Sequence, residues 1–194
     1  MKKKGTEPYH HGDLHNALLV AARAILEKKG LETLSLREVA RKAGVSHAAP
    51  YRHFKGHEAL LAALATEGFT ELRAEIVASI TPSDTEADRI TAIAAGYMRF
   101  VTGHPALARL MFGPQLPHRN KFPELAAAAE GVGADIGNAL DNPTLGLAAW
   151  AAVHGTAMLA LENLIDLGQS RSGTGVLPSR AEILLRGLFT AARS

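Results

Sequence analysis

The stretch SLREVARKAGVSHAAPYRHF, from Ser35 to Phe54, predicts two short helices joined by a tight turn. Ser35 and Glu38 have the spacing of a capping box, in which the hydroxyl accepts from an amide at the helix start and the carboxylate reaches back. Apolar residues then recur on one helical face, at Leu36, Val39, Ala40 and Ala43. Gly44 tolerates a positive φ, so we expect the first helix to end there.

The second predicted helix runs from His47 to Phe54, with Ser46 as its cap and Val45 as an apolar contact in the turn. Two short helices of which the second carries small and basic residues are typical of a helix-turn-helix. The second helix of that motif lies in the major groove of DNA. An ordinary helical hairpin has the same local pattern, so the pattern by itself leaves both interpretations open.

The basic residues are concentrated in the N-terminal part of the 194-residue chain, whose formal net charge is +2. Residues 1–55 contain 11 Lys and Arg against 5 Asp and Glu, whereas residues 56–194 contain 10 against 14. A basic segment joined to a mildly acidic remainder favours a module that binds a polyanion such as DNA, fused to a second functional part.

The composition also excludes several classes of protein. The chain has no cysteine, which excludes disulfides, thiolate zinc sites and cysteine nucleophiles. The basic N-terminus is not followed by the apolar run of a secretory signal. The most apolar stretch, Leu145 to Leu161, is interrupted by His154 and falls short of the roughly 20 apolar residues of a membrane span. We therefore expect a cytoplasmic protein that does not bind membranes.

The pattern along the chain predicts an all-α protein in three parts. Residues 1–12 form a basic arm, residues 13–56 a DNA-binding domain, and residues 57–194 a helical ligand-binding and dimerisation domain. Asp13 is the expected cap of the first helix and Gly30 its end. Further helices are predicted at about 57–80, 84–102, 105–112, 122–141, 143–167 and 179–192, with Pro, Gly and Asn between them.

The N-terminal part resembles the TetR family of bacterial transcriptional regulators over about residues 9–73. The likeness rests on TLSLREVA (33–40), AGVS (43–46), YRHFK (51–55) and EALL (58–61). YHHGDL (9–14), HAAPYRHF (47–54), Trp150 and VHG (153–155) are similar to a branch of that family with a so-called WHG C-terminal domain. The resemblance implies a homodimer that represses transcription from a double-stranded DNA operator and is released by a small apolar or amphipathic effector.

The resemblance also implies roles for individual residues of the motif. Recognition falls on Ser46 to His53, with His47, Ala48 and Ala49 facing bases, while Tyr51, His53 and Lys55 hold the DNA backbone. Arg37 can reach a phosphate or a base, and Arg52 contributes general electrostatic attraction. Pro50 stands where the family often has an aliphatic residue. Proline lacks an amide proton and crowds the preceding turn, so we expect the first turn of this helix to be loosened or shifted.

The C-terminal part offers candidate pocket and interface residues. Large or adaptable side chains predict an effector pocket, although plain core packing explains each of them as well. The set is Tyr97, Met98, Val101, Met111, Phe112, Trp150, His154 and Met158. The apolar helices 143–167 and 179–192 predict a four-helix dimer interface. Its candidate residues are Ala149, Ala152, Val153, Ala160, Ile183, Leu184 and Leu188.

Two other functions are left open by the sequence. An all-α enzyme would need catalytic groups, but the chain has no Ser-His-Asp, paired-carboxylate or phosphate-loop motif. We therefore predict a protein that is not an enzyme, without catalytic residues, metal ligands or cofactor. A DNA-binding regulator that responds to no small molecule is the second alternative.

Overall fold

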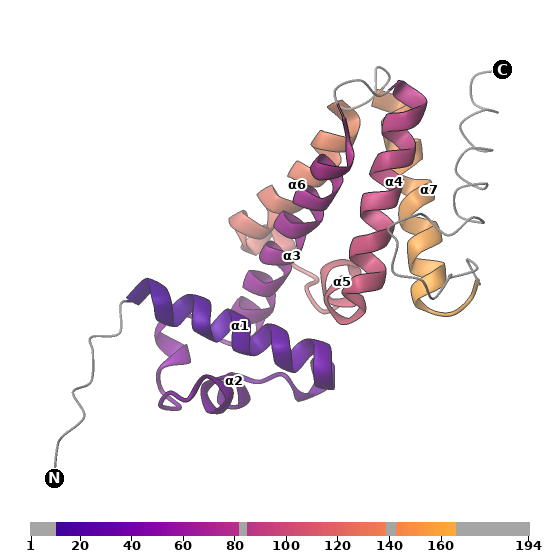
Figure 1. The fold of residues 1–194 in the computed structure, drawn as a ribbon. Helices are drawn as coiled ribbons and strands as arrows, with labels where there is room; N and C mark the ends of the chain where they lie inside the picture. The colour runs from indigo at the N-terminus through magenta and orange to yellow at the C-terminus, as the bar shows by residue number, and fades with distance from the viewer. Residues whose placement is uncertain (1–10, 82–84, 139–142, 166–194) are drawn as a thin grey trace, which may run out of the picture.

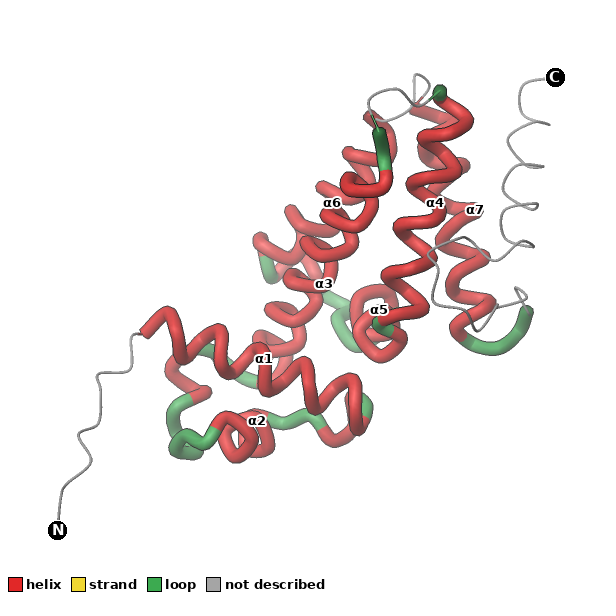
Figure 2. The backbone as a smooth tube through the Cα atoms, in the orientation of Figure 1, coloured by secondary structure: helices red, strands yellow, loops and turns green. Residues whose placement is uncertain are grey.

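The computed structural model describes residues 11–81, 85–138 and 143–165, and within these ranges every regular element is a helix (Figures 1 and 2). This confirms the predicted all-α class. The α-helices are α1 His11–Lys29, α2 Leu36–Ala43, α3 His57–Ser79, α4 Glu86–Gly103, α5 Pro105–Phe112, α6 Pro123–Asn138 and α7 Pro143–Leu161. Single-turn 3₁₀ helices are η1 Leu31–Thr33, η2 Pro50–Arg52 and η3 Arg119–Lys121.

The helices form an elongated molecule with a small head at one end (Figure 1). We call residues 11–56, which include α1, α2 and η2, the head, and helices α4 to α7 with the C-terminal half of α3 the body. Helix α3 runs from the head into the body, where it packs against α4 and α6. Helix α7 packs against α4 and α6, and α5 connects the body to the head by packing against α1 as well as against α3 and α4.

One apolar core extends through both the head and the body. In the head, Leu18 of α1 and Val39 of α2 are completely buried. Leu64 and Leu72 of α3 continue this core into the body, where they lie in the same cluster as Val101 of α4. Helix α3 contributes side chains to the core in both the head and the body. Because the core is closely packed, the position of the head depends on how α3 packs in the body.

Several predicted helix ends agree with the structure and others need correction. Helix α5 has the predicted bounds, and α1 ends before Gly30, whose φ is +78°. Helix α1 begins at His11, so Asp13 lies inside the helix and is not its cap. Helix α4 begins one residue after Thr85, which forms a capping box with Asp88 that was not predicted.

Helix α7 ends at Leu161, earlier than the predicted residue 167. Asn163 has a φ of +57°, and the Leu164 amide donates to the carbonyl oxygen of Leu159 at 2.8 Å. This is the hydrogen bond that closes a helix on a left-handed residue, a position in which Asn is tolerated. The predicted helix 179–192 and most of the predicted basic arm lie outside the described residues. In the part of the chain that is described, no helix has the length and hydropathy needed to cross a membrane.

Gly96 allows α3 and α4 to pack closely, and replacing it should destabilise the protein. A Cβ atom at Gly96 would lie 2.8 Å from the backbone oxygen of Glu75 and 3.1 Å from the Cα atom of Ile76. Backbone atoms cannot move aside as a side chain can, so we expect Gly96→Ala to lower the free energy of unfolding by about 1–2 kcal/mol. Gly133→Ala is the matched control, because a Cβ there meets nothing within 4 Å. In urea titrations the control should be more stable than wild type by about 0.5–1 kcal/mol; equal effects of the two substitutions would contradict this packing argument.

Candidate nucleic-acid interface

Helix α2 is held at both ends by the interactions that the sequence predicts, with one exception. The Ser35 hydroxyl accepts from the Glu38 amide at 3.2 Å, which confirms the N-cap. The Glu38 carboxylate does not complete the capping box, because it binds the Arg41 guanidinium at 2.6 Å. That hydrogen bond lowers the pKa of the Glu38 carboxyl. Gly44 adopts a φ of +70° and ends the helix as expected.

The predicted second helix is replaced by a turn and the single 3₁₀ turn η2. Pro50 has no amide proton, so the Ser46 carbonyl oxygen cannot accept the hydrogen bond that a regular α-helix would make to residue 50. It accepts instead from the Ala49 amide at 3.0 Å. Ala49 precedes η2 without a side-chain cap, so the prediction that Ser46 caps this element is wrong. The loosened first turn expected from Pro50 is confirmed.

The segment from Ser46 to Lys55, which we call the recognition segment, turns one side toward solvent and the other into the core. Ser46, His47 and Ala48 are exposed, and Ala49 is half-buried. Pro50 and Phe54 are buried and anchor the segment. The remaining candidate contact residues with exposed side chains are Tyr51, Arg52 and Lys55. Tyr51 has the most unusual position, because 57% of this large aromatic residue is accessible.

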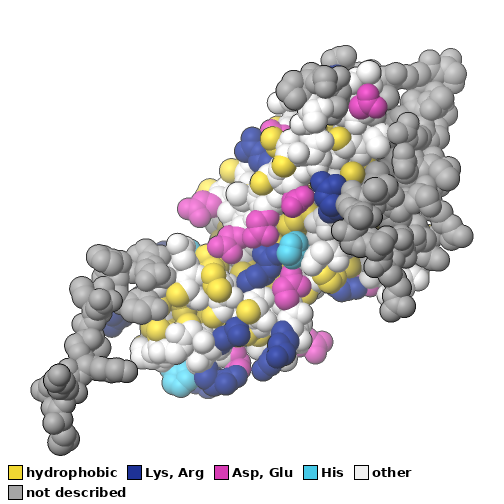
Figure 3. All heavy atoms as spheres, viewed as in Figure 1, with side chains coloured by type: hydrophobic (Ala, Val, Ile, Leu, Met, Phe, Trp, Pro, Cys, Tyr) yellow, Lys and Arg dark blue, Asp and Glu magenta, His cyan; other side chains and the backbone are white. Residues whose placement is uncertain are grey.

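The end of the molecule that carries the recognition segment is basic. Figure 3 shows Lys and Arg side chains gathered over the α1–α2 end. Between Arg37 and Lys55 the sequence has a single carboxylate, Glu38, and Arg41 neutralises it. Among the described residues, Arg37 and Arg52 form no ion pair, nor does Lys55. These cations are therefore free to bind phosphates.

His53 differs from the other candidate contact residues because its ring faces the inside of the head. It is half-buried, and its ring centroid lies 5.8 Å from that of His15 in α1. The His15 ring also contacts Phe54, at 5.1 Å between centroids. The role of His15 was not predicted, because residues 15 and 53 are brought together only by tertiary packing.

In the body, the structure brings four of the predicted pocket residues into one cluster. The Tyr97 hydroxyl and His154 Nδ1 are 2.7 Å apart. The Phe112 ring lies 4.6 Å from that of His154 and 6.2 Å from that of Tyr97, and the Trp150 ring lies 6.5 Å from that of His154. Trp150 Nε1 is buried and has no hydrogen-bond partner among the described residues.

The other predicted pocket residues belong to the packed interior or its edge. Met98, Val101 and Met111 are at most 2% exposed and lie in the core. Met158 is half-buried against it.

Burial raises the pKa of the Tyr97 hydroxyl and lowers that of the His154 imidazole. At neutral pH, the two groups therefore share a hydrogen bond between uncharged partners.

The lowered pKa of His154 predicts a dependence of stability on pH. As the pH is lowered through about 6.5, the unfolded chain binds a proton at this residue at a higher pH than the folded chain does. The free energy of unfolding therefore falls as the pH falls below this value, and above it this group has no effect. We expect the unfolding midpoint in urea to drop between pH 7.5 and pH 5.5, and His154→Gln to drop less. The exposed His118→Gln should keep the wild-type profile. An identical profile for His154→Gln and wild type would contradict the role of His154.

Helix α7 has two apolar sides. Ala149 and Val153 are 3% and 2% exposed and point into the subunit, so these two candidate interface residues do not offer surface to a partner. Ala152 and Ala160 are half-buried at the boundary. The other candidates, Ile183, Leu184 and Leu188, lie outside the described residues.

The solvent side of α7 carries Leu147, Ala148, Ala151 and Leu159, all exposed. Residues 147, 151, 155 and 159 recur every four positions, which places them along one face of a helix. We call this surface the outer face of α7. The i, i+4 repeat is present in the sequence, but an apolar helix has several such repeats, so sequence alone did not identify this one.

Comparison with known proteins assigns this architecture. Residues 18–64 match the family described as bacterial regulatory proteins, tetR family, and residues 90–172 match the tetracyclin repressor-like C-terminal domain. The HTH-type transcriptional regulator BetI of Rhizobium meliloti (strain 1021) is 32% identical over 93 residues, which are 48% of this chain and 44% of that protein. The chain thus spans less than half the length of this curated relative.

Solved structures share the fold over nearly the whole chain. A protein of unknown function from Rhodococcus sp. RHA1 is 32% identical, with a TM-score of 0.72 over 94% of this chain and 98% of that one. A bacterial regulatory protein in the tetR family from Rhodococcus RHA1 is 22% identical, with a TM-score of 0.63 over 89% and 95% of the two chains, a likeness of fold.

A helical head with a capped α2, an exposed basic tip and an all-α body behind it have the architecture of a helix-turn-helix regulator. The two family matches together cover about two thirds of the chain. The chain belongs to the TetR family of bacterial transcriptional regulators, which is not a family of enzymes.

Proposed function

We propose that this protein is a homodimeric repressor, acting in the cytoplasm, whose two heads bind one operator and leave it when a small molecule binds the body. Residues 13–56 are the DNA-binding domain, with family likeness to about residue 73, and residues 57–194 are the ligand-binding and dimerisation domain, of the WHG type. The observation that carries the proposal is the exposed Tyr51 ring among cations that have no ion-pair partner in the described part of the chain.

The recognition segment would use its exposed residues for two different tasks. Tyr51, Arg52 and Lys55 would hold the phosphate backbone together with Arg37, which orients the head without reading sequence. His47, Ala48 and Ala49 would face the bases: alanine methyl groups can contact a thymine methyl, and an imidazole can donate to a purine edge. Ser46 is exposed beside them. His53 would help to hold the backbone from the inner side of the segment.

Polar contacts between the head and the body would provide a path for the effector signal. The Arg23 guanidinium in α1 binds the Glu71 carboxylate in α3 at 3.1 Å. Glu27, one turn further along α1, lies 3.7 Å from His104 Nδ1, at the junction of α4 and α5. A shift of α4 on ligand binding would therefore reach α1 directly. The effector acts only if it binds one arrangement of these helices more tightly than the other.

The effector would be apolar or amphipathic and bind near the Tyr97–His154 cluster. The buried Trp150 Nε1, which has no partner within the described ranges, is a donor that a ligand oxygen would satisfy. A second candidate function, a regulator without a small-molecule effector, is favoured by one observation. Tyr97, Val101 and Met111 are completely buried, as in a packed core.

Selection from random double-stranded DNA tests the proposed function. We expect the protein to enrich a two-fold symmetric sequence whose half-sites lie about one helical turn, ~34–36 Å, or slightly more apart. His47→Ala should alter the base preference within each half-site, and Lys55→Ala should leave it unchanged. Enrichment of an unsymmetrical site, or of no sequence, would exclude a dimeric operator reader.

A further inference from the structure

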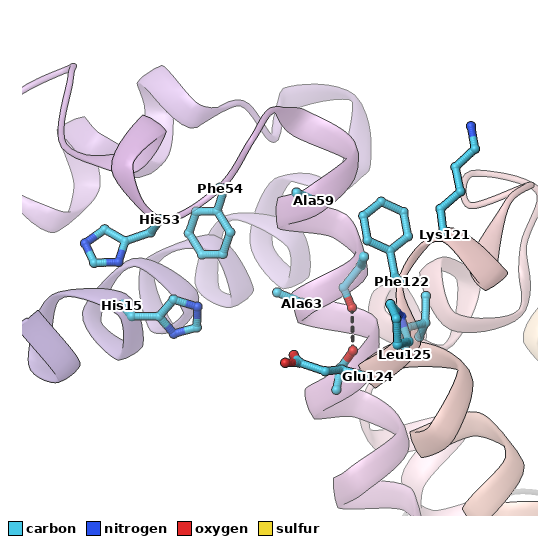
Figure 4. Close-up of a pocket in the computed structure, with 12 residues that line it drawn as sticks. His15, His53, Phe54, Ala59, Ala63, Lys121, Phe122, Glu124 and Leu125 are labelled. Atoms are coloured by element: carbon cyan, nitrogen blue, oxygen red, sulfur yellow. Dashed lines mark hydrogen bonds between the residues drawn. The ribbon is translucent and has the colours of Figure 1, made fainter.

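A cavity of about 310 Å³ lies where the head meets the body (Figure 4). Its head wall is formed by His15 of α1 with His53 and Phe54 of the recognition segment. The first half of α3 forms its floor, and residues 121–125, where η3 leads into α6, form the opposite wall. The volume is sufficient for a small molecule. The cavity is distinct from the Tyr97–His154 cluster, because none of the residues in that cluster lines it.

The lining is largely aromatic and apolar. On the head side the His15 ring contacts both the His53 ring and the Phe54 ring, with centroid distances of 5.8 and 5.1 Å. Ala59 and Ala63 of α3 present methyl groups to the cavity, and the Phe122 ring stands on the side of the body. Small side chains between two aromatic walls leave room for a flat ring.

One charged group is directed at this cavity from the body. In Figure 4 the Glu124 carboxylate points toward the side of His15, whereas the Lys121 side chain points away. Glu124 makes no hydrogen bond or ion pair with any described residue. A carboxylate beside aromatic faces is complementary to an organic cation, because the carboxylate pairs with the charge and the ring faces attract it.

We propose that this cavity is a second effector site, which binds a small aromatic amine in its protonated form. The ring of the amine lies between Phe54 and Phe122 over the alanines of α3, and the ammonium group binds the Glu124 carboxylate.

Such a ligand contacts the recognition segment itself. The His53 and Phe54 amides both donate to the Pro50 carbonyl oxygen, at 3.0 and 2.9 Å. Two residues of the cavity wall are thus hydrogen-bonded into the turn that presents Tyr51 and Arg52. An occupant of this cavity biases the conformation of the DNA-reading turn without passing through the body, whereas an effector at the Tyr97–His154 cluster would act through α4 and α1.

The test uses three probes of the same shape and different charge: phenethylamine, 2-phenylethanol and 3-phenylpropionate. Binding to the full-length protein without DNA is measured by ligand-observed NMR titration. We expect phenethylamine to bind at least about fivefold more tightly than either of the other two probes, because the amine alone can pair with Glu124. Glu124→Gln should remove this preference, since it keeps the shape of the side chain and removes its charge. Glu130→Gln, an exposed change further along α6, should keep it.

A second variant tests the place of binding. Ala63 is half-buried on the cavity floor, so Ala63→Leu fills the cavity and should abolish binding of all three probes. Ala59→Leu serves the same purpose if Ala63→Leu does not fold. Unchanged phenethylamine binding in a folded filling variant, or a preference for the carboxylate probe, would overturn the proposal.

The effect of the ligand on DNA binding rests on the proposed function, whereas the test of ligand binding itself does not. If the protein binds phenethylamine but selects no DNA, the proposed function fails and the site stands. If it selects an operator, the operator and phenethylamine must change each other's affinity by the same factor. A factor of one would show that the cavity is not coupled to the recognition segment and would overturn its role as an effector site.

Discussion

A protein that carries both Tyr51→Ala and Lys55→Ala is expected to bind its operator about 100-fold more weakly than the wild type. Both side chains are exposed on the recognition segment, and neither contributes to the core. The proposed dimer would present each of them twice, so the double variant would lose four of the proposed backbone contacts. Because these contacts carry no sequence information, affinity for every DNA sequence should fall together, and the selected motif should stay the same.

Fluorescence anisotropy at several salt concentrations separates the two contributions. Lys55→Ala should lower the slope of log affinity against log salt by about one per phosphate contact removed, whereas Tyr51→Phe, which keeps the ring, should leave the slope unchanged. Val77→Ala is the matched control, because Val77 is 53% exposed on α3 and lies outside the recognition segment. Wild-type affinity and slope in the double variant would exclude this segment from the interface.

The features of the head that sequence predicted well are those set by neighbouring residues. The cap at Ser35, the apolar stripe of α2 and the left-handed Gly44 depend on residues within one or two turns, and all three are present. The effect of Pro50 was predicted in kind, because a missing amide proton is a local property. Its extent was not, since the loss of the whole α-helix in favour of η2 also depends on how Phe54 and Pro50 are buried.

Features that depend on tertiary contacts were missed. Periodicity cannot show which of two possible partners a carboxylate will bind. The Glu38 carboxylate binds the Arg41 guanidinium rather than a backbone amide at the start of its helix. The inward turn of His53 and the cavity beside it require α1, the recognition segment and α6 to meet. These three segments are widely separated in the sequence, so no local pattern could have placed Glu124 opposite His15.

The apolar character of helix α7 was predicted, but Ala149 and Val153 were assigned to the wrong side of it. An all-apolar helix gives no amphipathic signal, so sequence could not say which stripe faces the subunit. The structure buries Ala149 and Val153 and leaves the outer face of α7 exposed. This exposed apolar helix face is therefore the position that we propose for the partner subunit of the dimer.

A charge on the outer face of α7 is therefore expected to convert the protein to monomers. In Ala151→Glu the carboxylate would be buried against the partner without a counter-charge. The free energy of burying this charge would exceed what association of the subunits provides. Ala151 is exposed within one subunit, so the substitution should leave the fold and the urea midpoint of the monomer intact. Light scattering after size exclusion should report a mass near the 20.5 kDa of one chain.

Monomers should bind the operator at least about 100-fold more weakly, because each head then binds without the effective concentration that its partner provides. Val77→Glu introduces the same charge at an exposed apolar position outside α7 and should remain dimeric with unchanged affinity. Leu159→Glu, on the outer face, should reproduce the effect of Ala151→Glu. If both outer-face variants stay dimeric, the subunits meet elsewhere. A monomeric variant that retained wild-type operator affinity would show that one head suffices, which is incompatible with a repressor that an effector controls by changing the distance between two heads.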